Sequence, residues 1–326
     1  MTQVLLTGAA GFIGFHVANH LLGLGHQVVG VDNLNDAYDV RLKLWRLDQL
    51  NKRDGFIYFR SDISDLVSIS KVWKETNFDA VINLAARAGV RQSVKDPWVY
   101  FETNVTGMLN LLSLCVKNGV EKFVQASTSS LYGAHTPRPF KEDADISRPL
   151  SPYAASKGAS EMICHSFHHM HGMDVSLLRY FTVFGPAGRP DMSIFRFIQW
   201  VAEDLPVIIY GDGEQERDFT FVEDIARGTV SALRSVGYEV INLGGDRPVK
   251  LMEVLRKIEA LLGKSAKIEW HDSAPADVRA TWADITKAGS ILGWEPQVSL
   301  DQGLEACVEW YQKERAWANQ VDTSDD

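Results

Sequence analysis

The chain is poor in cysteine, and it has neither a long apolar run nor an excess of positive charge. Only three of its 326 residues are cysteines, and no CxxC pair occurs. This count excludes a disulfide-built scaffold, so we expect three buried apolar thiols. No apolar run approaches the length that spans a bilayer. The segment MTQVLLTGAAGFIG lacks the basic start of a secretory signal, so we expect a cytoplasmic protein.

The formal net charge is −9, from 33 basic and 42 acidic residues. Nucleic acids and anionic membrane surfaces select basic proteins, so neither is expected as a partner. An anionic small molecule remains open as a ligand, because a few arginines in a cleft can outweigh the charge of the whole chain.

Expected strands and helices alternate along the first half of the chain, which is typical of βαβ units. Strands are predicted at QVLLTG, QVVGVD, FIYFRSDI, DAVINLAA and KFVQAS, and helices at segments such as GFIGFHVANHLLGLG and YFETNVTGMLNLLSLCVKNG. We therefore predict an α/β fold with a Rossmann-type doubly wound parallel sheet over residues 1–184. Beyond it, Gly, Pro and Asp separate shorter elements, so residues 185–326 are expected to form a smaller α/β lobe, with later segments recrossing to the first domain.

A glycine-rich turn follows the first expected strand. The segment TGAAGFIG places Gly8, Gly11 and Gly14 between a strand and a helix. Glycine permits the tight turn and the close approach of a pyrophosphate, which the N–H groups of the helix N-terminus then bind. A glycine-rich turn without a ligand is the alternative, but the strand before it and the helix after it favour dinucleotide binding.

An acidic residue, Asp32, ends the second expected strand, eighteen residues after Gly14. A carboxylate there hydrogen-bonds the ribose hydroxyls and repels a 2′-phosphate, which favours NAD over NADP. Arg41 and Lys43 lie nearby in the sequence and weaken that preference. Asp62 follows the third strand and is interpreted as a partner for the adenine edge, although a solvated loop acid fits the sequence nearly as well.

Tyr153 and Lys157 lie four residues apart in SPYAASKGASEMICHSFHHMHG, which predicts a helix capped by Ser151. This spacing places both side chains on one helix face. An adjacent ammonium group and the helix N-terminus favour the phenolate, so we expect the pKa of Tyr153 to fall from its usual value near ~10. A tyrosine tuned in this way can remove a proton from a sugar hydroxyl. A chance pair on a solvated helix face is the alternative.

These motifs together resemble a known family. The chain is similar to the nucleotide-sugar epimerase group of the extended short-chain dehydrogenases/reductases in TGAAGFIG, NLAA, STSSLYG, YAASK, RYFTVFGP, RDFTFVEDIA and TWADITKA. Within that group, NLNDAYDVRLK, AARAGVRQS and GPAGRPDM are most similar to UDP-glucuronate 4-epimerases. The resemblance implies a first domain that binds NAD and a second lobe that mainly binds a UDP-sugar.

The resemblance also implies roles for individual residues. Tyr153 is the implied base, Lys157 lowers its pKa, and Thr128 relays or steadies the proton. Residues predicted to bind the cofactor are Gly8, Gly11, Phe12, Ile13, Gly14, Asp32, Asn33, Lys43, Asp62, Ile63, Leu84, Ala85, Ala86, Asn104, Tyr153, Lys157 and Tyr180. Residues predicted to bind the substrate are Thr128, Ser129, Ser130, Thr182, Arg91, Arg189, Arg196, Arg217 and Asp277.

Some of these assignments have alternatives. Arg189 lies in a Gly/Pro loop, where arginines often bind ligands, and we favour it over Arg87 as a contact for an anionic substrate. Solvated surface charge is the alternative for every arginine. The chain departs from the family pattern at Asn83, usually histidine, at Arg87, usually glutamine, and at Ala276, usually glycine.

Three hydroxyls stand at the end of a strand in ASTSSLYGA: Thr128, Ser129 and Ser130. Oxidation of UDP-glucuronate at C4 gives a β-keto acid, which loses CO2 readily. Related decarboxylases carry glutamate at the position of Ser130, and related dehydratases carry acids at both serine positions. Small hydroxyls instead donate hydrogen bonds to a carboxylate without repelling it. Ordinary turn chemistry is the alternative.

We therefore predict an NAD-dependent isomerase that converts UDP-glucuronate to UDP-galacturonate through a transient 4-keto intermediate. The alternatives are the same reaction on UDP-glucose and UDP-galactose, decarboxylation of UDP-glucuronate, and an NAD-binding sensor without catalysis. No metal is expected, although His165 and His169 have a spacing that could bind one. The family is commonly dimeric through two helices per subunit, here 101–118 and 153–171, so a homodimer is expected.

Overall fold

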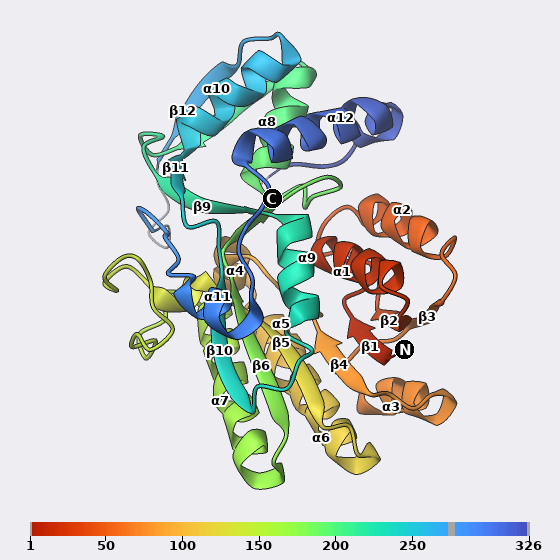
Figure 1. Ribbon diagram of the computed structural model, residues 1–326. Helices are drawn as coiled ribbons and strands as arrows, with labels where there is room; N and C mark the ends of the chain where they lie inside the picture. Colours follow the sequence, from red (N-terminus) through yellow and green to blue (C-terminus); the bar gives the residue numbers. More distant parts are fainter. Residues whose placement is uncertain (1, 273–277, 325–326) are drawn as a thin grey trace.

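A sheet of seven parallel strands forms the centre of the protein (Figure 1). The computed structural model describes residues 2–272 and 278–324. The strand order is β10-β6-β5-β4-β1-β2-β3. The first strand, β1, therefore lies inside the sheet; β2 and β3 are added on one side of it, and β4 and the later strands on the other. The strands are β1 (Gln3–Thr7), β2 (Gln27–Asp32), β3 (Phe56–Arg60), β4 (Ala80–Asn83), β5 (Lys122–Thr128), β6 (Asp174–Tyr180) and β10 (Tyr238–Leu243).

Helices cover both faces of this sheet, which confirms the predicted doubly wound α/β fold. Neighbouring strand residues point to opposite faces, as Leu5 and Leu6 do, and both are fully buried because each face has its own core. One face packs against α1 (Phe12–Gly23), α9 (Val222–Ser231) and α11 (Thr286–Leu292). The other packs against α3 (Leu66–Glu75), α6 (Met108–Asn118) and α7 (Pro152–His171).

The long helix predicted from YFETNVTGMLNLLSLCVKNG is interrupted by a wider turn. It consists of α5 (Trp98–Phe101), a π-helical turn (Glu102–Gly107) and α6. A β-carbon on Gly107 would lie 2.6 Å from the Cγ1 atom of Ile63, so the glycine lets the turn pass close to the loop after β3. Such turns frequently mark functional sites, and this one faces the loop after β4.

A smaller lobe lies above the sheet in Figure 1. It contains the sheets β11-β9-β7 and β12-β8, which pack on three helices around a separate apolar core. Three elements that come after residue 184, α9, β10 and α11, pack with the large sheet and not with the smaller lobe. The domain boundary at residue 184 remains a prediction. The elements of the lobe are β7 (Thr182–Phe184), α8 (Ser193–Ala202), β8 (Pro206–Tyr210), β9 (Glu216–Phe221), β11 (Pro248–Lys250), α10 (Leu251–Leu262), β12 (Lys267–His271) and α12 (Leu300–Ala318).

The remaining helices border the cavity described below: α2 (Val40–Leu50), α4 (Val90–Lys95) and the 3-10 turn Ser129–Tyr132. All three cysteines are free and buried, as predicted: Cys115, Cys164 and Cys307. Over the described residues, none of the helices combines the length and apolar character needed to cross a membrane.

Candidate active site

The glycine-rich turn forms a close-packed cradle between β1 and α1. Gly8 has a φ of +69°, and a β-carbon on Gly14 would lie 2.0 Å from the carbonyl oxygen of Gly8. Helix α1 starts after Gly11 with no side chain capping its first N–H groups. Backbone donors and the positive end of the helix dipole therefore meet where no side chain intrudes, which fits the pyrophosphate of a dinucleotide.

Asp32 lies buried at the carboxyl end of β2, beside this turn. Its carboxylate accepts hydrogen bonds from the backbone N–H of Ala10 at 3.2 Å and of Leu34 at 2.9 Å. The Nζ atom of Lys43 lies 3.8 Å from its Oδ1 atom and donates to Asn35 at 2.9 Å. The carboxylate is thereby fixed in the position that suits a ribose diol.

Asp62 belongs to the same rim and is part of a hydrogen-bond network. It accepts from the side chain of Asn33 at 2.7 Å and from the backbone and hydroxyl of Ser64. Burial pushes its pKa up, but the hydrogen bonds from Ser64 and Asn33 bring it below the ordinary value. This arrangement differs from the freely solvated loop acid that the sequence left open.

One cavity at the carboxyl ends of the parallel strands brings most of the predicted residues together. It runs from the glycine turn, past Asp32, to the end of β5 and the start of β7. Ligands of open α/β sheets bind at this edge, where the strand order reverses. The predicted residues that line it are Gly8, Gly11, Phe12, Ile13, Gly14, Asp32, Asn33, Lys43, Asp62, Ile63, Leu84, Ala85, Ala86, Thr128, Ser129, Ser130, Tyr153, Lys157, Tyr180, Thr182 and Arg189.

Asn104 does not line this cavity. It lies buried in the π-helical turn, accepts from the backbone N–H of Arg87 at 2.9 Å, and donates to the carbonyl oxygen of the same residue at 3.0 Å. It also donates to the hydroxyl of Ser156 on α7. Asn104 therefore braces the loop after β4 against α7, and the cofactor contact that we predicted for it stays a prediction.

Three of the predicted arginines also lie outside the cavity lining. Arg91 stacks over the ring of Tyr210, with its guanidinium carbon 4.1 Å from the ring centroid. Arg196 is buried on α8, where its Nη2 atom donates to the carbonyl oxygen of Ser324 at 3.0 Å. Arg217 on β9 donates to the carbonyl oxygen of its neighbour. Asp277 lies outside the described residues.

Arg189 does reach the cavity, where it faces the end of α7. It forms an ion pair of 2.5 Å with Asp191, and both residues lie in the cavity wall. Lys43 lies close enough to interact with the charges of both Arg87 and Arg189. The cavity wall thus holds three cations, Lys43, Lys157 and Arg189, beside the carboxylates of Asp32, Asp62 and Asp191, and a single arginine can still bind an anionic group locally.

Tyr153 stands in the first turn of α7, opposite the end of β5. Ser151 caps the helix by accepting from the backbone N–H of Ala154, as predicted. The Tyr153 hydroxyl is enclosed and hydrogen-bonds to Thr128. The Oγ1 atom of Thr128 lies 3.2 Å from both the hydroxyl and the backbone nitrogen of Ser130. A chain of three hydroxyls therefore leads from α7 along the end of β5.

Lys157 lies one helical turn after Tyr153, as predicted, but its ammonium group points to the strand. Its Nζ atom donates to the carbonyl oxygen of Ala126 at 2.7 Å. Burial lowers the pKa of Lys157 to about 8, although the nearby carboxylate of Glu161 opposes this shift. That carboxylate is itself bound by Arg179 at 2.7 Å, within the core.

The expected fall in the pKa of Tyr153 is wrong for this structure. Burial raises its pKa, while the hydrogen bond to Thr128 and the charge of Arg189 oppose the rise. The cause is geometric: Lys157 directs its charge toward Ala126, so desolvation outweighs the nearby favourable interactions. The cation that lowers the pKa of Tyr153 is Arg189 and not Lys157.

The chain is similar to a known protein family and to individual members of it. The sequence model of the "NAD dependent epimerase/dehydratase family" matches residues 4–244, more than half of the chain. The chain belongs to this family. A UDP-glucuronate 4-epimerase of Thermodesulfobacterium geofontis is 52% identical over 311 residues, which are 95% of this chain and 96% of the relative.

Two solved epimerases have the same fold. The UDP-glucuronic acid 4-epimerase of Bacillus cereus, in complex with UDP-glucuronic acid and NAD, superposes with a TM-score of 0.89 at 39% identity, over 96% of this chain and 99% of the other. The UDP-glucose 4-epimerase of Thermotoga maritima, with UDP-glucose, gives a TM-score of 0.88 at 31% identity, with the same two coverages. These likenesses confirm the predicted epimerase resemblance and the dependence on NAD.

Several cavity residues of this epimerase-family chain were not predicted from sequence. Asn35, Tyr38 and Asp191 line the cavity, and Arg46 binds to Tyr38 just behind it. The sequence does contain a pattern that could have indicated them. The segment NLNDAYDVRLKLWRL places Lys43 and Arg46 on the face of α2 that also carries Leu42 and Leu50. Two cations on an otherwise apolar face are unusual and indicate a buried polar function.

Proposed function

We propose that the chain catalyses the NAD-dependent 4-epimerisation of UDP-glucuronate to UDP-galacturonate. The observation that carries this proposal is the row of hydroxyls from Tyr153 through Thr128 to Ser130, with Arg189 in the wall of the same cavity and its charge acting on Tyr153. It combines a proton acceptor with groups that can bind a carboxylate. The end of β5 contributes no acid to this row.

The cofactor site fits the residues present. The turn at Gly8 and Gly14 would hold the pyrophosphate, and Asp32 the ribose next to the adenine. When bound, NAD supplies the hydride acceptor and donor for the sugar carbon C4. The protein's own contribution is to orient the sugar and to handle the proton of the C4 hydroxyl.

Tyr153 is the proposed base for that proton. Its hydroxyl and that of Thr128 already share a hydrogen bond, so a proton taken at Tyr153 Oη can be held within the hydroxyl row. Burial disfavours the phenolate in the protein as described, and Thr128 and Arg189 favour it. The reaction therefore depends on these two groups to keep the base usable.

The carboxylate of the substrate is the second group that the site must control. We infer that Ser129, Ser130 and Thr182 donate hydrogen bonds to it, with Arg189 as the nearby cation, since all four line the cavity. Held in this way, it does not align with the C4 carbonyl and is slow to leave as CO2. The fold alone does not separate this substrate from UDP-glucose, because the Thermotoga maritima enzyme shares it.

We also propose that the protein acts as a homodimer in the cytoplasm. Trp98 on α5 is 81% exposed. It lies with other exposed apolar side chains on the neighbouring helices α6 and α7, which supports the expected contact with a second copy. Three free buried cysteines are consistent with a reducing compartment. The exposed apolar residues of these two helices are Leu109, Val116, Met162 and Met170.

The activity is tested by incubating the purified protein with UDP-glucuronate and identifying the sugar by NMR. Formation of UDP-galacturonate supports the proposal. Loss of CO2 supports decarboxylation, and turnover of UDP-glucose alone supports the neutral-sugar alternative. Bound NAD with no turnover of any of these substrates supports the sensor.

A further inference from the structure

Arg46 is fully buried on α2, and its guanidinium group uses all five N–H donors within the protein. Its Nε and Nη2 atoms donate to the carbonyl oxygen of Ala187 at 3.0 and 2.7 Å, and Nη2 also donates to Gly188 at 3.1 Å. Its Nη1 atom donates to the carbonyl oxygen of Ala10 at 3.1 Å and to the hydroxyl of Tyr38 at 2.8 Å.

These partners come from two different parts of the site. Ala10 belongs to the glycine-rich turn, whereas Ala187 and Gly188 belong to the loop after β7. A lysine could not replace the arginine here, because the planar fork reaches both loops at once. Arg46 therefore joins the cofactor side of the cavity to the loop that carries Arg189.

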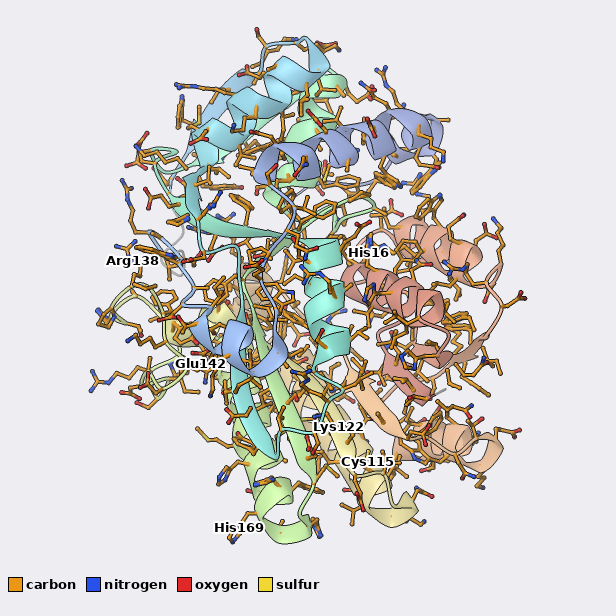
Figure 2. The ribbon with its side chains drawn as sticks, in the orientation of Figure 1. His16, Cys115, Lys122, Arg138, Glu142 and His169 are labelled. Atoms are coloured by element: carbon orange, nitrogen blue, oxygen red, sulfur yellow. The ribbon has the colours of Figure 1, made fainter. Side chains whose placement is uncertain are left out.

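The loop after β7 needs such support. Ala187 has a φ of +51°, in the left-handed region that a non-glycine residue rarely adopts without being held there. A second contact also reaches this loop from the cofactor side: the Nε2 atom of His16 lies 3.2 Å from the carbonyl oxygen of Pro186. Figure 2 shows His16 on α1, the helix that follows the glycine-rich turn.

The charge of Arg46 is balanced by no carboxylate among the described residues within ion-pair distance. The polar groups around it are carbonyl oxygens and one phenol, and its neighbours include Lys43, a further cation. Burying a cation without a counter-charge is costly. A pyrophosphate at the glycine-rich turn, next to Ala10, would supply that negative charge.

We propose that Arg46 is a positioning residue that couples NAD retention to the placement of Arg189. Occupation of the pyrophosphate site stabilises the buried guanidinium, and the guanidinium holds the 185–191 loop in the form that presents Arg189 to the substrate. This inference rests on the proposed function for the identity of the substrate. By linkage, UDP-glucuronate should also slow the loss of NAD.

Two substitutions of Arg46 separate the effect of its charge from the effect of its planar guanidinium group. Arg46→Lys keeps the charge, but a lysine cannot reach both loops. The NAD content should therefore stay within about twofold of wild type. KM for UDP-glucuronate should rise roughly tenfold to hundredfold, and kcat should change less. Arg46→Gln removes the charge as well, so bound NAD should also fall. Arg53→Lys is the matched control, since Arg53 lies just after α2 and its side chain donates to Asn19, away from both loops.

A merely structural role would lower thermal stability in Arg46→Lys and leave KM of the folded fraction unchanged. That result, or full NAD content in Arg46→Gln with an unchanged KM, would overturn the proposal. Hydrogen exchange of the wild-type protein provides a test without any variant or turnover. Removing NAD should speed exchange in residues 185–191, and an unchanged rate there contradicts the coupling whether or not UDP-glucuronate is the substrate.

Discussion

The Nζ atom of Lys157 donates a hydrogen bond of 2.7 Å to the carbonyl oxygen of Ala126, across the gap between α7 and β5. The lysine is only 3% exposed, and burial lowers its pKa to about 8 despite the opposing charge of Glu161. At neutral pH the protein therefore carries a buried ammonium group that is more easily accommodated in the unfolded chain.

This burial gives a pH dependence of stability that Lys157→Met should remove. The folded pKa lies below the unfolded one, so the unfolded chain binds more protons between pH 8 and about 10.5. The free energy of unfolding should rise with pH across that window, by about 3 kcal/mol in total. Urea unfolding at pH 8, 9 and 10 measures most of the rise.

The Lys157→Met variant should show a flatter curve over the same pH range. Lys52→Met is the control, because Lys52 is an exposed residue of the same type and should keep the wild-type slope. Equal slopes in the wild type and in Lys157→Met would show that the lysine is not desolvated in solution.

The hydrogen bond between Thr128 and Tyr153 predicts a shift in the pH–rate profile. Thr128→Val removes a group that lowers the pKa of Tyr153, so the acid limb of kcat should move to higher pH and kcat at pH 7 should fall. Tyr153→Phe should lower kcat by roughly 10²- to 10⁴-fold and leave UDP binding intact. Thr128→Ser keeps the hydroxyl and serves as control.

Activity near the wild-type level in Tyr153→Phe would rule out the base assignment. A Thr128→Val variant with a lower kcat but an unmoved acid limb would instead show that Thr128 positions the sugar and does not tune the phenol.

The row of hydroxyls at Tyr153, Thr128 and Ser130 predicts how an acidic residue at position 130 would change the products. Ser130 lies 3.2 Å from Thr128, so Ser130→Glu brings a carboxylate beside the base and the substrate carboxylate. Like charges at this distance repel, so epimerisation should fall and CO2 release should rise relative to it. Product NMR and CO2 trapping measure both, and Ser130→Gln is the neutral control. Unchanged rates of both reactions would leave the hydroxyls a role in turn structure only.

The sequence predicted the parts of the site that depend on chain order and local spacing. Gly8 follows β1, and Asp32 and Thr128 end β2 and β5 of the same parallel sheet, whose strands have their carboxyl ends at one edge. The pair of Tyr153 and Lys157 follows from helix periodicity alone. These features need no knowledge of how the two lobes pack.

The parts that sequence could not predict depend on packing between distant segments. Arg196 faces the C-terminal segment because of how α8 sits on its neighbours, although we predicted that it binds the substrate. The pKa of Tyr153 is decided by the balance of burial against nearby charge, which spacing does not contain. Arg46 touches residues 141 and 142 positions away along the chain, so its role becomes visible only in the folded protein.

The exposed apolar side chains predict the state of assembly. If α5, α6 and α7 form a dimer contact, Trp98→Glu should convert the protein from dimer to monomer in light scattering. Trp270→Glu is the control, because this residue is also exposed but lies on β12 in the smaller lobe. A wild-type protein that is already monomeric, or a Trp98→Glu variant that stays dimeric, contradicts this interface.

The most direct test of the account is a single incubation of the purified protein with UDP-glucuronate and no added NAD, in buffered 2H2O, followed by NMR. The account predicts UDP-galacturonate without release of CO2 and without uptake of deuterium at C4, because the retained cofactor removes and returns the same hydride. Deuterium at C4, or CO2 in place of the epimer, would contradict it.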